Sequence, residues 1–294
     1  MKILKQSCVA VAIIVLASGL LLADTIEERF EKTVPLEYGG YFALANKNGS
    51  IEISSWDREE VRIEALKKVK SSSRRVAREA MEELRIEIDT RGSDEVIVET
   101  DYPYEHGGES LGGALSAIFG GQKKPQISVT YRITVPERVD LKIGTTNGSI
   151  EVEDIEGEAQ VSSTNGKVEM AYMKGFLDVS TTNGRIELID IDGGLDAGTT
   201  NGSVEVRYSS RADITEDISI RTTNGGIELR LPEDIDADVN ARTTNGHIDT
   251  DFPITVRGRY GKKHLSGQIN DGGPLIELKT TNGSINIRSS RVRI

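Results

Sequence analysis

The sequence predicts an all-β fold: a β-solenoid of stacked two-stranded coils, with one N-terminal helix packed on or near its end. Three observations predict this fold. A Thr-Thr-Asn-Gly tetrapeptide or a close variant recurs along the chain, apolar and polar residues alternate on both sides of it, and glycine is abundant, at 30 of 294 residues. A fixed repeat period near 20 residues is typical of proteins in which each repeat forms one supersecondary unit.

The spacing of the repeated asparagine sets the length of one coil. The first four lie 18 residues apart, so we expect a period of about 18 residues. The later intervals are 23, 21 and 37 residues, which predicts insertions in the C-terminal coils. The repeated residues are Asn147, Asn165, Asn183, Asn201, Asn224, Asn245 and Asn282, and a related Asn48 stands upstream.

The repeat from Leu177 to Ile191 shows what one coil contains. Alternating apolar residues predict a strand before Asn183-Gly184 and a second strand after it. Asn-Gly tolerates the two positive φ angles of a type I′ turn, so we expect that turn between the strands. A second glycine ten residues later predicts the other corner; in successive repeats it is Gly157, Gly175 and Gly193.

Stacked coils place equivalent residues in register at about 4.8 Å, so sequence columns become ladders in space. We expect the asparagine amides to form a structural ladder, each donating to one neighbour and accepting from the other, with the preceding inward Thr or Ser hydroxyls joining it. The inward hydroxyl residues are Thr145, Ser163, Thr181, Thr199, Thr222, Thr243 and Thr280. One expected core column, in sequence order, is Ile150, Val168, Ile186, Val204, Ile227, Ile248 and Ile285.

The N-terminus predicts export. Residues 1–23 combine Lys2 and Lys5 with an apolar run too short to span a bilayer, which is typical of a secretory signal peptide; an uncleaved anchor is the alternative. The single cysteine, Cys8, lies in this segment, so the mature chain has no thiol. The mature chain keeps 34 basic and 47 acidic residues, a net charge of −13, which argues against nucleic acid as a partner.

The chain after the leader divides into an N-terminal β module, residues 24–140, and the solenoid repeats, residues 141–294, which continue it as one domain. Residues 73–84 carry an apolar stripe at helical spacing and predict the helix. Trp56 is expected in the core of this module. Three Gly-Gly pairs mark an insertion at 105–124, which we expect to be a loop.

No catalytic constellation emerges from the sequence. His106, His247 and His264 are far apart, the serines have no evident base, and the glycine pairs match no phosphate-binding fingerprint. We therefore expect that the protein is not an enzyme and that it binds no cofactor.

One outward acidic column suggests a metal site. Like charges about 5 Å apart repel, so either neighbouring Lys167, Arg185 and Arg207 relieve them or calcium does. The column comprises Glu151, Glu169, Glu187, Glu205 and Glu228, with Asp249 beyond them. An outward threonine column could order ice, but Arg221 and Arg242 on the same face argue against that use.

The chain resembles a known family. The segment from Asn48 to Ile53 with Trp56-Asp57, the helix, the segment Tyr131 to Pro136 and the Asn-Gly-Ser-Ile-Glu-Val units resemble the bacterial β-strand-repeat proteins grouped as a "putative adhesin" domain of unknown function. The resemblance covers nearly all of the chain after the leader. It implies an exported or envelope-associated β-solenoid without established enzymatic activity; the insertion at 105–124 departs from the family pattern.

The sequence and the resemblance together favour a non-enzymatic, exported protein at the cell surface, outside the cell or in the periplasm. It would act as an adhesin-like surface protein or an envelope scaffold, with a cell-surface or envelope protein or a glycan as partner. Membrane contact is expected only through an uncleaved leader. A glycan-active enzyme on a β-helix and a calcium-stabilised envelope structural protein are the alternatives.

Overall fold

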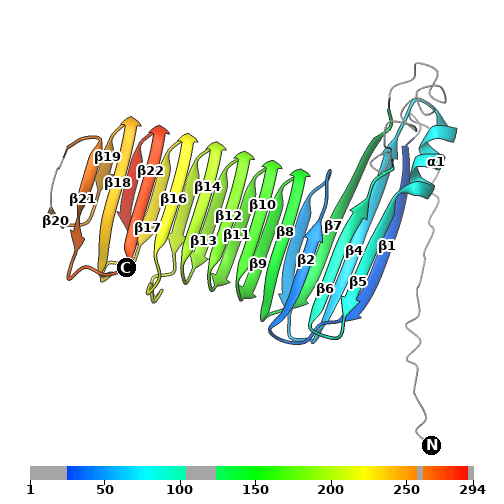
Figure 1. The fold of residues 1–294 in the computed structure, drawn as a ribbon, viewed down its shortest axis with the longest axis horizontal. Coiled ribbons are helices and arrows are strands. Elements are labelled where there is room, and N and C mark those ends of the chain that lie inside the picture. The colour runs from blue at the N-terminus through cyan, green and yellow to red at the C-terminus, as the bar shows by residue number, and fades with distance from the viewer. Residues whose placement is uncertain (1–24, 104–123, 257–260, 291–294) are drawn as a thin grey trace, which may run out of the picture.

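Two long, mostly parallel sheets face each other along the whole molecule (Figure 1). The computed structural model describes residues 25–103, 124–256 and 261–290. One sheet has 11 strands and the other has 12 among the described residues. The predicted all-β solenoid is confirmed. The expected signal peptide, residues 1–23, and the insertion at 105–124, except for Lys124, lie outside the described residues.

Each regular coil contributes one strand to each sheet. Parallel pairing sets equivalent residues opposite one another, for example Asn165 opposite both Asn147 and Asn183. The strand pairs are β8 (Val139–Asn147) with β9 (Ile150–Glu156), β10 (Ala159–Asn165) with β11 (Val168–Lys174), β12 (Leu177–Asn183) with β13 (Ile186–Ile191), β14 (Leu195–Asn201) with β15 (Val204–Tyr208), β16 (Ile218–Asn224) with β17 (Ile227–Leu231), β18 (Ala237–Asn245) with β19 (Ile248–Thr250), and β22 (Leu275–Asn282) with β23 (Ile285–Ser289).

The space between the sheets is filled by one hydrophobic cluster that runs through the stack. Inward residues alternate with outward ones along each strand, so that Ile186 and Leu188 are fully buried while Glu187 between them is half-buried. Burying an aliphatic side chain of this size contributes about 1.5–3 kcal/mol, which is why the alternating pattern governs the fold.

The Asn-Gly corners are not type I′ turns, and that prediction is wrong. Among the described residues, none of the repeated asparagines has a positive φ. Glycine is required there by the close approach of neighbouring coils, because a Cβ on Gly184 would lie 1.9 Å from the carbonyl oxygen of Gly166. The other corner does use positive φ, +123° at Gly175 and +121° at Gly193.

The coils at the two ends do not stack in sequence order, contrary to the expectation of successive coils. The coil of β2 (Gly40–Ala45) and β3 (Ile51–Trp56) lies between β8–β9 and the coil of β6 (Glu95–Asp101) and β7 (Gln126–Pro136). At the other end, β22 lies between β16 and β18 (Figure 1), and the sheet order places β23 between β17 and β19. The last coil is thus inserted into the stack.

Additional elements extend the stack at both ends. At the N-terminal end, β1 (Thr25–Pro35) pairs antiparallel with β4 (Glu60–Lys70), and β5 (Arg85–Arg91) pairs antiparallel with β6. The predicted helix is present as α1 (Arg74–Glu83), which packs against β4 and β1. At the other end, β20 (Ile254–Val256) and β21 (His264–Ile269), both from the 37-residue interval, extend the 12-stranded sheet beyond β18.

Trp56 is not a core residue, contrary to the prediction. It is half-buried at the end of β3, where its indole Nε1 donates to the carbonyl of Glu60 at 2.7 Å. The guanidinium of Arg58 lies 4.9 Å from the ring centroid. The indole therefore caps a corner of the coil at the surface.

Candidate functional site

The outer face of the 11-stranded sheet carries the predicted acidic column; we call it the glutamate face. Its members from Glu52 to Asn286 in the stack point away from the core because their neighbours on each strand are buried, whereas the neighbours of Asp249 are half-buried. The stack places Asn286 between Glu228 and Asp249. The acidic column is therefore interrupted, contrary to the prediction of acids in successive coils. In spatial order it comprises Glu52, Glu151, Glu169, Glu187, Glu205, Glu228, Asn286 and Asp249.

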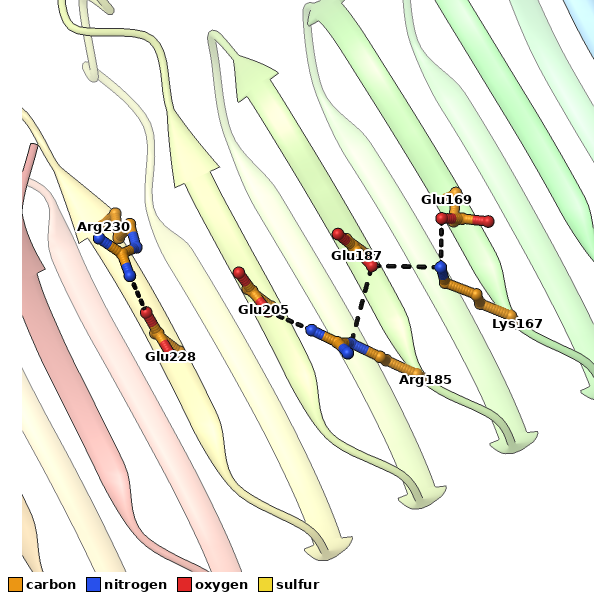
Figure 2. Close-up of polar contacts among 7 residues, drawn as sticks. All are labelled: Lys167, Glu169, Arg185, Glu187, Glu205, Glu228 and Arg230. Carbon is orange, nitrogen blue, oxygen red and sulfur yellow. Dashed lines mark hydrogen bonds and ion pairs between the residues drawn. The ribbon is translucent and has the colours of Figure 1, made fainter.

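Cations from the adjoining corners interleave with these glutamates (Figure 2). Lys167 pairs with Glu169, and its Nζ lies 3.2 Å from Glu187 Oε2. Arg185 pairs with Glu205, and its Nε lies 3.8 Å from Glu187 Oε2. The hydrogen bond to Glu169, against the opposing effect of partial burial and with help from Glu187, raises the pKa of the Lys167 ammonium.

Of the three cations predicted to relieve the repulsion, Lys167 and Arg185 pair with glutamates of the column, whereas among the described residues no ion pair of Arg207 is found. Arg230 pairs with Glu228, Arg132 with Glu52 and Arg288 with Asp249, each at the protein surface. Exposed pairs of this kind contribute about 0–1 kcal/mol each, so the network sets the charge pattern of the face more than its stability. Over the described ranges, no group of three or more His, Cys, Asp or Glu residues is placed to hold a metal ion. The calcium ladder stays a prediction.

The asparagine column forms a hydrogen-bonded ladder along one corner of the stack. Each Nδ2 donates to Oδ1 of the neighbouring asparagine at 2.8–2.9 Å, and all the bonds run in the same direction. In spatial order the members are Asn48, Asn147, Asn165, Asn183, Asn201, Asn224, Asn282 and Asn245. The first member is the upstream asparagine, which therefore belongs to a true coil.

The inward hydroxyls do not join this ladder, contrary to the prediction. They are buried, and they donate to the carbonyl of the corner glycine in the adjacent coil, as Thr199 does to Gly184 at 3.1 Å. The glycine carbonyl is the nearer acceptor because the coils approach closely there. The Oγ1 of Thr145 is the exception and has no hydrogen-bond partner.

A polar cluster that the sequence did not predict occupies the N-terminal end of the core. The Nδ2 of Asn46 donates to the Val129 carbonyl at 2.8 Å, and its Oδ1 accepts from the Tyr102 hydroxyl at 2.8 Å. The Tyr131 hydroxyl lies 2.7 Å from Thr100 Oγ1. Burial raises the pKa of Tyr131 well above its usual range. The residues are far apart in sequence, so no local signal could have grouped them.

Three loops of the C-terminal half gather into a groove of about 500 Å³. They contain Ala212–Thr215, Pro232–Asp236 and Gly272–Pro274, and they follow from the longer repeat intervals noted in the sequence. Asp213, Asp234 and Asp236 line the groove. The Asp236 carboxylate accepts the Asp271 N–H at 3.2 Å.

One serine does have a histidine partner, so the expectation that the serines lack a base is wrong for Ser284. Its Oγ lies 2.9 Å from Nδ1 of His247, because β22–β23 is inserted next to β18–β19. The histidine is exposed. In the part of the chain that the structure describes, no carboxylate forms a hydrogen bond or ion pair with His247, so the pair lacks the acid of a Ser-His-Asp triad.

Comparison with protein families identifies a matching family model. The family described as Toastrack DUF4097 matches residues 126–288. Among the curated proteins, none matches the chain. In the part of the chain that the structure describes, no helix is long and apolar enough to cross a membrane.

Several solved structures are similar over most of their length. A "putative cell adhesion protein" from Clostridium sporogenes ATCC 15579 is 16% identical, with 90% of this chain and 100% of that chain covered and a TM-score of 0.39. A "putative adhesin" from Bacteroides fragilis NCTC 9343 is 10% identical, with 89% and 97% covered and a TM-score of 0.36. A "putative adhesin" from Parabacteroides merdae ATCC 43184 is 12% identical, with 90% and 96% covered and a TM-score of 0.37. At such identities and TM-scores, the roles of those proteins do not transfer to this chain.

Proposed function

The chain belongs to the Toastrack DUF4097 family, and on that basis we propose that it is a non-enzymatic, exported protein that binds a partner at the bacterial envelope or cell surface. The observation that supports this proposal is the glutamate face. It repeats one outward residue type from coil to coil, with Lys167 and Arg185 between the acids. Solenoids use such extended, regular surfaces to bind extended partners.

The chemistry of this face favours a partner with repeated polar or charged groups, such as a glycan or an extended segment of an envelope protein. Successive carboxylates follow the strand spacing of about 4.8 Å, so a polymer could meet several coils at once. The acidic mature chain and its leader-like residues 1–23 agree with an exported protein that does not bind nucleic acid.

Binding of isolated cell envelopes tests the proposal. The double variant Glu169→Gln/Glu187→Gln should weaken envelope binding at least about tenfold, whereas Asp178→Asn/Asp196→Asn, which makes the same charge change on the 12-stranded sheet, should leave it unchanged. Equal loss in both variants would indicate non-specific electrostatics. No loss in either variant would exclude the glutamate face.

The location of the protein in the cell distinguishes an adhesin-like surface protein from an internal envelope scaffold. Protease treatment of intact cells, with mass spectrometry of the released peptides and of the mature N-terminus, separates them. Released solenoid peptides with an N-terminus at Asp24 indicate surface exposure. Protected peptides indicate a scaffold inside the envelope, and a retained residue 1 indicates an uncleaved leader.

A glycan-active enzyme is the alternative, and the groove of Asp213, Asp234 and Asp236 is the observation that favours it. Turnover of an acidic polysaccharide that is lost in Asp234→Asn/Asp236→Asn would support the enzyme.

Calcium binding by the glutamate face is tested separately by calorimetric titration at millimolar calcium. Absence of a heat of binding would exclude a calcium site on the glutamate face.

A further inference from the structure

The free sheet edges at the ends of the stack are potential docking surfaces. An unpaired strand exposes backbone N–H and C=O groups that can pair with another chain. The outermost strands are β1 and β19 in one sheet and β5 and β20 in the other. β19 and β20 have only three residues each, β5 has seven, and β1 has eleven. β1 is therefore the most extensive free edge among the described strands.

We propose that β1 pairs antiparallel with β1 of a second copy of this chain, about a twofold axis at Phe30. In this register Arg29 lies opposite Glu31 of the second copy, and Glu28 lies opposite Lys32 of the second copy. Ile26 lies opposite Val34 of the second copy, and Phe30 lies opposite its own symmetry mate. Each contact between two different residues occurs twice, because a twofold interface is self-complementary.

The neighbouring registers are unfavourable, which makes the proposal specific. Opposite residues of an antiparallel pair must lie on the same face, so the axis passes through a residue. An axis at Arg29 places Arg29 opposite itself and Glu27 opposite Glu31. An axis at Glu31 places two glutamates opposite each other. Like charges directly opposite destabilise a strand pair, so Phe30 is the centre that charge favours.

The other edge at the same end lacks this property. An antiparallel pairing of β5 about Ile88 would set Glu87 opposite Asp89 and Arg85 opposite Arg91. Both contacts are repulsive. Charges on an edge strand commonly serve to prevent pairing, and β5 follows that rule while β1 has the complementary arrangement.

The charges of β1 are only partly used within one copy. Glu28 pairs with Lys67 and Glu31 with Arg62, each at 2.9 Å, and Glu27 pairs with Lys68 at 2.9 Å. In the described part of the chain, no ion pair is found for Arg29 or Lys32. The pairing would give both cations a carboxylate of the second copy, and it would cover the partly buried Ile26 and Phe30.

Complementary charge reversal tests the register. In the full chain, Arg29→Glu alone and Glu31→Arg alone should each raise the dimer dissociation constant at least about tenfold, because two attractive contacts become repulsive. An equimolar mixture of the two variants should restore dimers, since every contact is then attractive. Sedimentation velocity measures the result. A monomeric parent chain, or a mixture no more dimeric than either variant, would overturn the proposal.

Cysteine cross-linking tests the geometry independently. In a Cys8→Ala background, Phe30→Cys should form a disulfide-linked dimer, because directly opposite Cα atoms lie about 4.5–5.5 Å apart in an antiparallel pair. If loss of the Phe30 ring impairs folding, Glu27→Cys mixed with Thr33→Cys serves instead, and neither of these variants should cross-link alone. Cross-linking of Glu27→Cys with itself, or none in the mixture, would contradict the register.

Discussion

At the residue scale, the stack separates two polar ladders that look alike in sequence. The asparagine amides bond to one another along the corner, whereas the buried Thr and Ser hydroxyls bond to glycine carbonyls. A buried hydroxyl without a partner is costly, and one such hydroxyl is present at Thr145. The contribution of a buried hydroxyl to stability can therefore be compared between a bonded position, Thr199, and the unbonded position Thr145.

Thr199→Val should lower the free energy of unfolding by about 1 kcal/mol, because it removes a buried hydrogen bond and leaves the Gly184 carbonyl without that donor. Thr145→Val, at an equivalent and equally buried position, should be neutral or stabilising because its hydroxyl has no partner. Urea denaturation of both variants measures the difference. Equal destabilisation would show that the hydroxyl bonds do not matter.

Two buried tyrosines predict loss of stability at alkaline pH. Burial is the main cause that raises the pKa of Tyr131 and Tyr208 well above their usual value near 10. The folded state therefore keeps both protons when the unfolded state loses them. The stability is fully present below about pH 10 and falls above it, by about 1.4 kcal/mol per pH unit for each tyrosine.

Tyr208→Phe should make this alkaline loss shallower, although it also removes the hydrogen bond to the Gly193 carbonyl. The exposed Tyr172→Phe is the control and should keep the parent slope. Denaturation at a series of pH values from 7 upward gives the slopes. If Tyr208→Phe follows the parent above pH 10, the burial of this hydroxyl does not govern the alkaline transition.

At the element scale, the Asn-Gly corner shows why a local signal was misread. The dipeptide is typical of a type I′ turn, which needs positive φ, yet here the strands lie in different sheets and the chain only bends between them. The glycine is selected by the backbone of the neighbouring coil. That contact does not exist in an isolated hairpin, so the turn preference of the dipeptide could not reveal it.

Gly184→Ala should destabilise the protein by at least about 3 kcal/mol, since the new Cβ would lie 1.9 Å from the Gly166 carbonyl oxygen and neither backbone can move alone. Gly144→Ala is the control: its nearest neighbour would be Ser162 Oγ at 3.6 Å, so the variant should be neutral or slightly stabilising. Thermal unfolding of the pair tests this. A tolerated Gly184→Ala would mean that the coils can separate locally.

At the scale of the whole molecule, the order of the coils in the stack departs from their order in the chain at both ends. β22–β23 is the last coil in the chain but lies between two earlier coils. Those earlier coils therefore cannot complete their pairing until the C-terminal residues are present. In a quasi-one-dimensional stack, each coil depends on its neighbours, so the effect of losing one coil should stay local.

Truncation after Ile269 should remove amide protection from β18 and β19, whereas β10 to β13 should stay protected because their pairing does not involve the removed residues. The coil of β18–β19 loses protection because it loses the strands that join it to the rest of the stack. Hydrogen exchange with mass spectrometry, compared with the full chain, measures both regions. Protected β18 and β19 peptides in the truncated chain would contradict the dependence of this coil on β22–β23.

Much of the fold and part of the candidate surface follow from local sequence patterns. The alternation around Ile186 and Leu188, the 18-residue spacing and the helical stripe near Val76 report burial and backbone geometry within one coil or one helix, so they lead to the solenoid, its core columns and α1. The outward position of Glu187 follows from the same alternation.

The order of the end coils, the placement of Asn286 in the acidic column, the His247–Ser284 contact and the groove of Asp234 and Asp236 arise only when the chain is assembled. Each depends on which coil lies beside which. The coils present similar core residues to their neighbours, so the alternation of one coil does not specify its place in the stack. Chain connectivity and the packing of the ends settle that choice.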